Sequence, residues 1–512
     1  GISQKLAQAS VLHRIDENNE FIDTRVFNEK GKVVAPRVAT SLRILQEERG
    51  NTTLDPLDPK DFKKIVMIMA AEAEAALRGD KNAIGWYEDK VATMFEFMGK
   101  IEGGNQQILN DPDARAAFTF AMAVTSNGLS VNQNFVSAME EYKVWKETGL
   151  FKADGYGSKG AEAMRKSFAF YNTLKRDLNM TDVQIQEYLT QETTVRQLKK
   201  DPVIQELGIE IPSGELQDTK VRVAHVLGAK IGNGFYMNLN GEFDALTMDM
   251  WWMRMWNRII GKPFKEPTDA TNNKNRKRIQ ESVEGDLTEF EQRLVEDTML
   301  DEGLDSLEGQ NIDQFAVALN KKFQRIFTKF SAAEADQRPE KTPLFQAADT
   351  HSQNLSGKFE QATPRNGTER QVMRDAAESS RELLKEKTGI DINNADFQAL
   401  MWYHEKRLLA SMGTKSTGAD NDYVDGAIAY ARREGFTDDQ IAEALPPTDR
   451  DRVYPDSGAR RQDEGISRES AENDTAANLK YSVSPAKAAA IAVRVGAGDN
   501  GRVWRRKRSS RE

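Results

Sequence analysis

The chain has 512 residues, a formal net charge of −9, 39% hydrophobic residues and no cysteine. This length allows a sizeable core and about two to four domains. The lack of cysteine excludes a disulfide framework, a thiolate zinc site and an iron–sulfur cluster.

The histidine spacing and the hydropathy exclude metalloproteins and membrane-spanning proteins as further classes. The histidines lie far apart and form no HExxH motif, so we predict no metal site and no cofactor. No apolar run approaches the roughly 20 residues that span a bilayer, and no signal peptide is visible. We therefore expect a soluble, cytoplasmic protein without a membrane partner. Because the chain begins with Gly1 instead of Met, a trimmed or processed piece of a longer protein is one interpretation.

Hydrophobic periodicity predicts a mainly α-helical protein. Residues 1–60 read as an N-terminal arm, with a short β-hairpin from alternation over Glu20–Phe27 and a turn at Asn28–Gly31. Residues 61–330 are predicted to form a helical core, because apolar positions recur there at helical spacing. We expect amphipathic helices over residues 286–300 and 313–330 to close that core.

The C-terminal third is predicted to be organised differently. Residues 331–368 are rich in Gln, Asn, Thr, Ser, Gly and Pro and read as a linker. Residues 369–445 predict a second, smaller helical module. Residues 446–512 are rich in Asp, Arg and Ser, end in the basic run Arg505–Arg508, and predict an extended, partner-bound tail.

The central stretch, Val221–Ile260, combines a glycine turn, a lysine, the acidic residue Asp249 and a tryptophan-rich helix. Lys230 follows Gly228 by two residues and opens an apolar helical segment. Asp249 precedes the tryptophan-rich helix, where it is either an N-cap or a carboxylate with a catalytic role. Lys230 is either a solvated lysine or a nucleophile. Both pairs of interpretations stay open from the residues alone.

The residues Gly228-Ala229-Lys230-Ile231 and Thr247-Met248-Asp249 resemble the signature of helix–hairpin–helix DNA glycosylases, in particular the 8-oxoguanine glycosylase branch. In that branch the hairpin ends in Gly-x-Lys, and an aspartate opens the next helix nineteen residues later, which is the spacing from Lys230 to Asp249. The stretch from Ala121 to Asn127 resembles the family's helix junction beside the extruded base. The resemblance covers roughly residues 118–261, under a third of the chain.

The hairpin departs from the family pattern at two positions. The family usually has Leu-Pro-Gly-hydrophobic-Gly, whereas this chain has His225 in place of the proline and Val226 in place of the first glycine. Because glycine supplies a positive φ at no steric cost, we expect a hairpin without it to be reshaped.

The resemblance implies a DNA glycosylase/AP lyase that flips out a damaged or modified base. Lys230 would attack the sugar and form a Schiff base, and Asp249 would stabilise positive charge. Asn127 would border the gap left by the base, and Gly234 would leave room in a base pocket. DNA phosphate would meet the backbone of the hairpin residues Val226, Leu227, Gly228 and Ala229.

Two alternatives remain beside the enzyme. One is a catalytically inactive DNA-binding or virion-associated structural protein on the same fold. The other is an unrelated helical scaffold in which Lys230 and Asp249 coincide by chance. The chain as a whole looks like a module of large phage proteins, so a host-cytoplasm or virion location and other phage or virion proteins as partners of the tail are expected.

Overall fold

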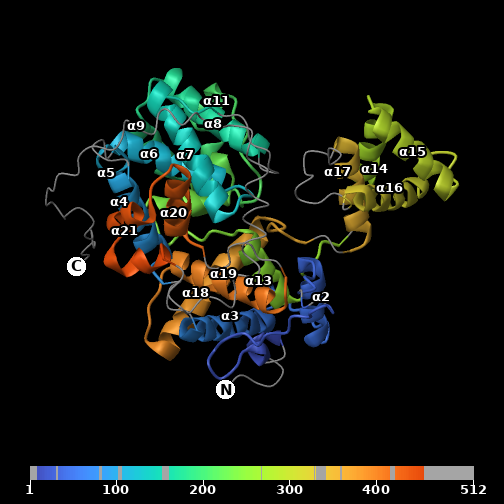
Figure 1. The fold of residues 1–512 in the computed structure, drawn as a ribbon, viewed down its shortest axis with the longest axis horizontal. Coiled ribbons are helices and arrows are strands. Elements are labelled where there is room, and N and C mark those ends of the chain that lie inside the picture. The colour runs from blue at the N-terminus through green and yellow to red at the C-terminus, as the bar shows by residue number, and fades with distance from the viewer. Residues whose placement is uncertain are drawn as a thin grey trace.

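The computed structural model describes residues 9–454 with gaps at 30, 32, 80–83, 102–106, 153–160, 267, 328, 330–341, 358–359 and 415–420. The described part is mainly helical, as predicted (Figure 1). Its two strands, β1 (Glu192–Thr194) and β2 (Lys220–Arg222), form one antiparallel pair with Thr193 opposite Val221. Most of the predicted tail, including its basic end, lies outside the described residues.

Helices before residue 262 belong to the main body. They are η1 (Leu12–Arg14), α2 (Val38–Glu48), α3 (Pro59–Gly79), η2 (Trp86–Lys90), α4 (Val91–Ile101), α5 (Gln107–Asn110), α6 (Pro112–Thr125), α7 (Val131–Thr148), α8 (Ala161–Arg176), α9 (Asp182–Thr190), α10 (Val195–Leu198), α11 (Pro202–Glu206), η4 (Val223–Leu227), η5 (Ile231–Phe235), α12 (Tyr236–Leu239) and α13 (Met250–Ile260).

The remaining helices fall into two groups. A separate lobe consists of α14 (Asp269–Glu284), α15 (Glu289–Glu302), α16 (Asn311–Phe327) and α17 (Pro343–Leu355). The main body is completed by α18 (Gly367–Thr388), α19 (Asn394–Ser411), α20 (Tyr423–Arg433), α21 (Asp438–Ala444) and η7 (Pro447–Arg452).

The cores divide the chain differently from the sequence prediction. One hydrophobic cluster takes residues from 54 to 260 and again from 373 to 453, so the predicted second module is part of the main body. The helices expected to close that core, α15 and α16, instead pack with α14 and α17 around their own cluster, from Ile279 to Ala348. Periodicity identified the apolar faces, but it carries no information about which core buries them.

The lobe leaves and rejoins the body at one place (Figure 1). Phe264 and Glu360 pair in an antiparallel bridge, and the Gln361 N–H donates to the Pro263 carbonyl at 3.1 Å. Arg254 of α13 donates to the Glu360 carboxylate at 2.7 Å. The predicted linker, residues 331–368, therefore contains helix α17 and the return segment of an inserted lobe.

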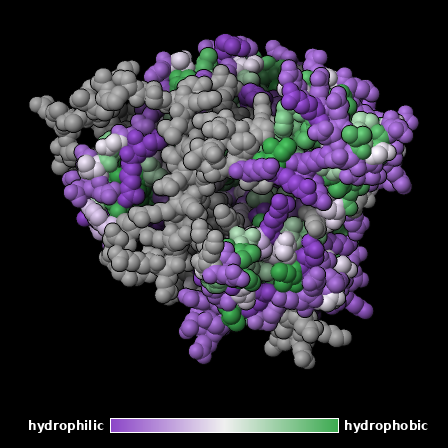
Figure 2. Space-filling model, turned by 45° about the vertical axis from the view of Figure 1, so that its right-hand side comes forward, coloured by the Kyte–Doolittle hydropathy of each residue, from purple (hydrophilic) through white to green (hydrophobic). Residues whose placement is uncertain are grey.

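The N-terminal arm packs on the end of α19. Phe27 and Val33 form an isolated antiparallel bridge around the predicted turn, and the Thr24 N–H donates to the Ser411 carbonyl at 2.8 Å. Figure 2 shows a largely hydrophilic face with scattered hydrophobic residues. Among the described helices, none has the length and apolar character needed to cross a bilayer.

Candidate functional site

The hairpin that carries Lys230 consists of two short helical turns in backbone contact. The 3₁₀ turn η4 ends at Gly228, whose φ of 100° requires glycine, and the π-helical turn η5 follows Lys230. A Cβ atom on Gly232 would lie 1.7 Å from the Ala224 carbonyl oxygen, so η4 and η5 can approach this closely only because residue 232 is glycine. Val226 has no positive φ, so its backbone conformation does not require glycine.

His225 fixes the hairpin from inside. Its Nε2–H donates to the Pro212 carbonyl at 3.1 Å, and its Nδ1 accepts from the Asn233 side chain at 2.9 Å. The Asn233 oxygen accepts from the Arg222 N–H at 3.2 Å, which connects the hairpin to β2. Burial lowers the pKa of His225 to about 4, so the ring is neutral and this tautomer persists near neutral pH.

Asp249 is the N-cap of α13. Its carboxylate accepts the Trp252 N–H at 2.8 Å, so the capping interpretation of this residue is confirmed. The side chain is half-buried. Burial raises the pKa of the Asp249 carboxyl, and the opposite charge of Lys230 is the largest effect that lowers it.

Lys230 and Asp249 interact electrostatically. Burial lowers the pKa of the half-buried Lys230 ammonium, and the Asp249 carboxylate opposes that shift. Each group therefore lies close enough to perturb the other. Within the described residues, however, no ion pair within 4 Å joins Lys230 to a carboxylate. The structure thus brings the amine and the carboxylate together without a direct contact.

Gly234 has a different role from the one expected. A Cβ atom there would lie 2.8 Å from Thr247 Oγ1 and 2.9 Å from Thr247 Cα. The space in front of Gly234 is therefore filled by Thr247 and does not form a base pocket. Thr247 in turn donates to the Asn238 side chain at 2.8 Å. This packing holds the segment that leads to Asp249 against the hairpin that carries Lys230.

The four hairpin residues predicted to meet DNA differ in their burial and in whether their backbone N–H groups already donate a hydrogen bond. The Gly228 N–H donates to the His225 carbonyl at 2.9 Å, so this amide is already used inside the hairpin. The Ala229 N–H makes no hydrogen bond to the described residues. Leu227 and Ala229 are buried, and Val226 and Gly228 are half-buried. The Ala229 amide is therefore not used inside the hairpin, although the residue itself is buried.

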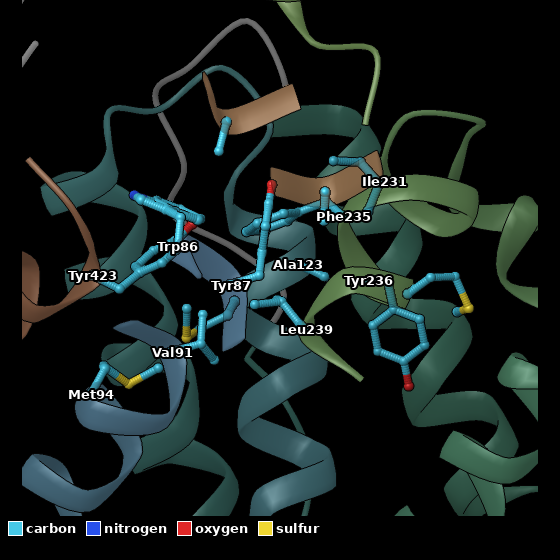
Figure 3. Close-up of a cluster of buried hydrophobic side chains, with 14 of the residues drawn as sticks. Trp86, Tyr87, Val91, Met94, Ala123, Ile231, Phe235, Tyr236, Leu239 and Tyr423 are labelled. Atoms are coloured by element: carbon cyan, nitrogen blue, oxygen red, sulfur yellow. The ribbon is translucent and has the colours of Figure 1, made fainter. Parts of the chain in front are cut away.

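Aromatic side chains from distant segments pack together in the core next to the hairpin (Figure 3). Tyr87 of η2 lies with its ring centroid 6.1 Å from that of Phe235, and Phe235 lies 6.1 Å from Tyr423 of α20. The Tyr87 hydroxyl donates to Gln398 of α19 at 3.3 Å. Burial, with smaller effects from Tyr423 and Asp249, raises the pKa of the Tyr87 hydroxyl and keeps it protonated.

The α6–α7 junction joins this cluster through buried hydrogen bonds. Thr125 donates to the Asn134 side-chain oxygen at 2.6 Å, and the Asn134 amide donates to the Tyr423 hydroxyl at 2.5 Å. Asn127 is half-buried in the intervening turn. The predicted junction is therefore linked to the aromatic cluster, with Asn134 making the connection.

Sequence reasoning missed the partners of Tyr87 and Phe235 in this neighbourhood, Gln398 and Tyr423. Tyr87 belongs to an aromatic run that is typical of a core, whereas Gln398 and Tyr423 lie in the stretch expected to be a separate module. No local pattern signals the approach of Gln398 to Tyr87 or of Tyr423 to Phe235, because it depends on α19 and α20 entering the main core.

No cluster of three or more metal-binding side chains occurs in the described parts of the chain. In comparisons with known proteins, no family model, curated protein or solved structure matches this chain. A functional assignment therefore depends on the residues and their geometry alone.

Proposed function

We propose that the chain is a DNA glycosylase with AP-lyase activity that uses Lys230 as its nucleophile. The observation that carries the proposal is the meeting of Lys230 and Asp249 at the exit of the hairpin, with the pKa of the amine lowered by burial. A lysine with a lowered pKa has a larger neutral fraction near pH 7 and is a better nucleophile.

The reaction begins after the target nucleotide leaves the stack, since its glycosidic bond is unreachable inside a duplex. The neutral Lys230 amine attacks C1′ while the C1′–N bond breaks, and the base leaves with the bonding electrons and takes up a proton. Loss of the amine proton and opening of the sugar ring give a Schiff base between Lys230 and C1′. Asp249 stabilises the positive charge that develops on the sugar.

Borohydride trapping tests the proposal. The wild-type chain, incubated with duplexes that carry an abasic site or a modified base, should form a covalent adduct in the presence of borohydride. Lys230→Gln should abolish the adduct, and Asp249→Asn should slow its formation. Lys387→Gln, at an exposed position on α18, is the matched control and should trap like wild type. A chain that traps no lesion refutes the enzyme.

An inactive DNA-binding protein on the same fold is the second candidate. The N-cap bond from Asp249 to Trp252 favours it, because capping alone gives the aspartate a structural reason to be present. DNA binding that weakens steeply with salt, without any trapped adduct, would support this candidate.

A further inference from the structure

Helix α19 brings a second lysine to the start of α13, where Asp249 is the N-cap. Lys406 is 4% exposed, and its Nζ lies 3.7 Å from the centroid of the Trp402 ring and 5.5 Å from that of Trp251. Trp251 follows Asp249 by two residues, and its backbone N–H also acts on the Asp249 carboxylate. The buried ammonium and the start of α13 therefore lie together.

We propose that Lys406 is a positioning residue of the site, which keeps the Asp249 carboxylate ionised while Lys230 is in its reactive, neutral form. This inference rests on the proposed function. It adds a residue from α19, in the second half of the chain, to a site whose other two members lie within the hairpin region.

The need for a second cation follows from the chemistry of the pair. Burial raises the pKa of Asp249, and both Lys230 and Lys406 lower it. When Lys230 loses its proton to become a nucleophile, the carboxylate loses one of its two counter-charges. The ammonium of Lys406, which contacts the face of the Trp402 ring, remains as the other. Without it, Asp249 would tend to take up a proton as Lys230 becomes neutral.

Few other groups compete for this role in the described structure. Lys230 of the hairpin, Lys406 of α19 and Tyr87 of η2 interact electrostatically with Asp249, and α13 itself contributes backbone N–H groups. Tyr87 stays neutral because burial raises the pKa of its hydroxyl. Lys406 is therefore the charge that remains beside Asp249 when Lys230 is neutral.

The pH dependence of adduct formation on abasic DNA tests this role. In Lys406→Met, the acidic limb of the trapping rate should move to higher pH by about one unit, as expected for loss of a nearby opposite charge. Lys406→Arg should restore the limb, and Lys387→Met on the surface of α18 should leave it in place. A Lys406→Met chain that is slower at every pH, with an unmoved limb, would show a purely structural lysine and overturn the inference.

A direct titration separates this inference from the proposed function. Carbon NMR of chains labelled at the aspartate carboxyl carbon, with Asp249→Asn to assign the signal, gives the midpoint of Asp249. The midpoint should be higher in Lys406→Met than in wild type, and equal midpoints overturn the inference. If the wild type traps no DNA, the proposed function fails and this titration alone decides the role of Lys406. Lys406→Gln replaces Lys406→Met if the latter does not fold.

Discussion

Gly232 and Ala224 are in backbone contact: a Cβ atom on the glycine would lie 1.7 Å from the alanine carbonyl oxygen. This contact fixes how η4 and η5 approach each other and therefore where Lys230 begins the second turn. The oxygen belongs to the backbone of a buried segment, so it cannot move aside as a flexible side chain could.

Gly232→Ala should therefore destabilise the protein strongly. Overpacking in a well-packed core typically costs about 1–3 kcal/mol, and this overlap belongs at or above the upper end of that range. Denaturant unfolding provides the measurement. Gly285→Ala is the matched control, because its Cβ would lie 3.4 Å from the nearest atom and its φ is negative. Equal stability of the two variants would contradict the packing described for the hairpin.

Gly234→Ala should lower both activity and stability. Its Cβ would lie 2.8 Å from Thr247 Oγ1, so Thr247 must shift, and the segment that leads to Asp249 shifts with it. A displacement of about 1 Å at a reacting pair can cost roughly 100-fold in rate. We expect the trapping rate to fall by roughly 10–100-fold and the unfolding midpoint to fall as well, because the new Cβ would also lie 2.9 Å from the backbone Cα of Thr247.

Thr247→Ala in the Gly234→Ala background is the companion experiment. The smaller side chain relieves crowding by removing the hydroxyl oxygen that would lie 2.8 Å from the new Cβ, and it gives up the hydrogen bond from Thr247 to Asn238. Partial recovery of the trapping rate would locate the defect in this contact. Full activity of Gly234→Ala alone would show that the contact does not position Asp249.

The local features of the site were predictable from sequence, and its surroundings were not. The nineteen-residue spacing and the Asp249 cap depend on neighbouring residues, which sequence patterns describe well. The approach of Lys406 and Tyr423 depends on α19 and α20 returning to a core begun more than 300 residues earlier. The role of Gly234 was misjudged for the same reason, because a missing side chain marks close packing without showing which atoms fill the space.

Arg258 should be essential for stability. Its guanidinium is buried and pairs with Glu72 of α3 at 2.7 Å and Glu405 of α19 at 2.8 Å. Arg258→Met would leave two buried carboxylates without their partner, which typically costs about 3–5 kcal/mol. The variant should lose this free energy of unfolding at pH 8 and recover part of it at lower pH, where the carboxyl groups can be protonated. A pH-independent loss would contradict this explanation.

Acid should destabilise the body through its buried histidines. Burial lowers the pKa of both His225 and His404 to about 4, below the usual 6.5. The unfolded chain therefore binds more protons, so the contribution to stability is complete above pH 6.5 and is lost as pH falls toward 4. Each histidine accounts for up to about 3 kcal/mol over this window.

Asp396 opposes this trend in part. Burial raises the pKa of its carboxyl to about 6, so the folded chain takes up that proton first and gains stability as pH falls through 6. Because two histidines destabilise the fold in acid and one carboxyl stabilises it, the free energy of unfolding should fall as pH is lowered. Unfolding measured from pH 7 to pH 4.5 should show a decline in stability that is shallower in His404→Gln and steeper in Asp396→Asn. A wild-type curve that rises toward acid would contradict the assignment.

The lobe of α14–α17 should be dispensable for the chemistry. It has its own hydrophobic cluster, and its ends meet where Phe264 pairs with Glu360 (Figure 1). Replacing residues 265–359 by a short Gly-Ser turn should keep the Arg254–Glu360 ion pair and the helical content of the body. The trimmed chain should trap abasic DNA at a rate within about twofold of wild type if the lobe takes no part in the chemistry, because the site residues all lie in the body. A folded but inactive chain would instead place the lobe in DNA binding, and salt titrations of DNA affinity on both chains would then show how many phosphate contacts it supplies.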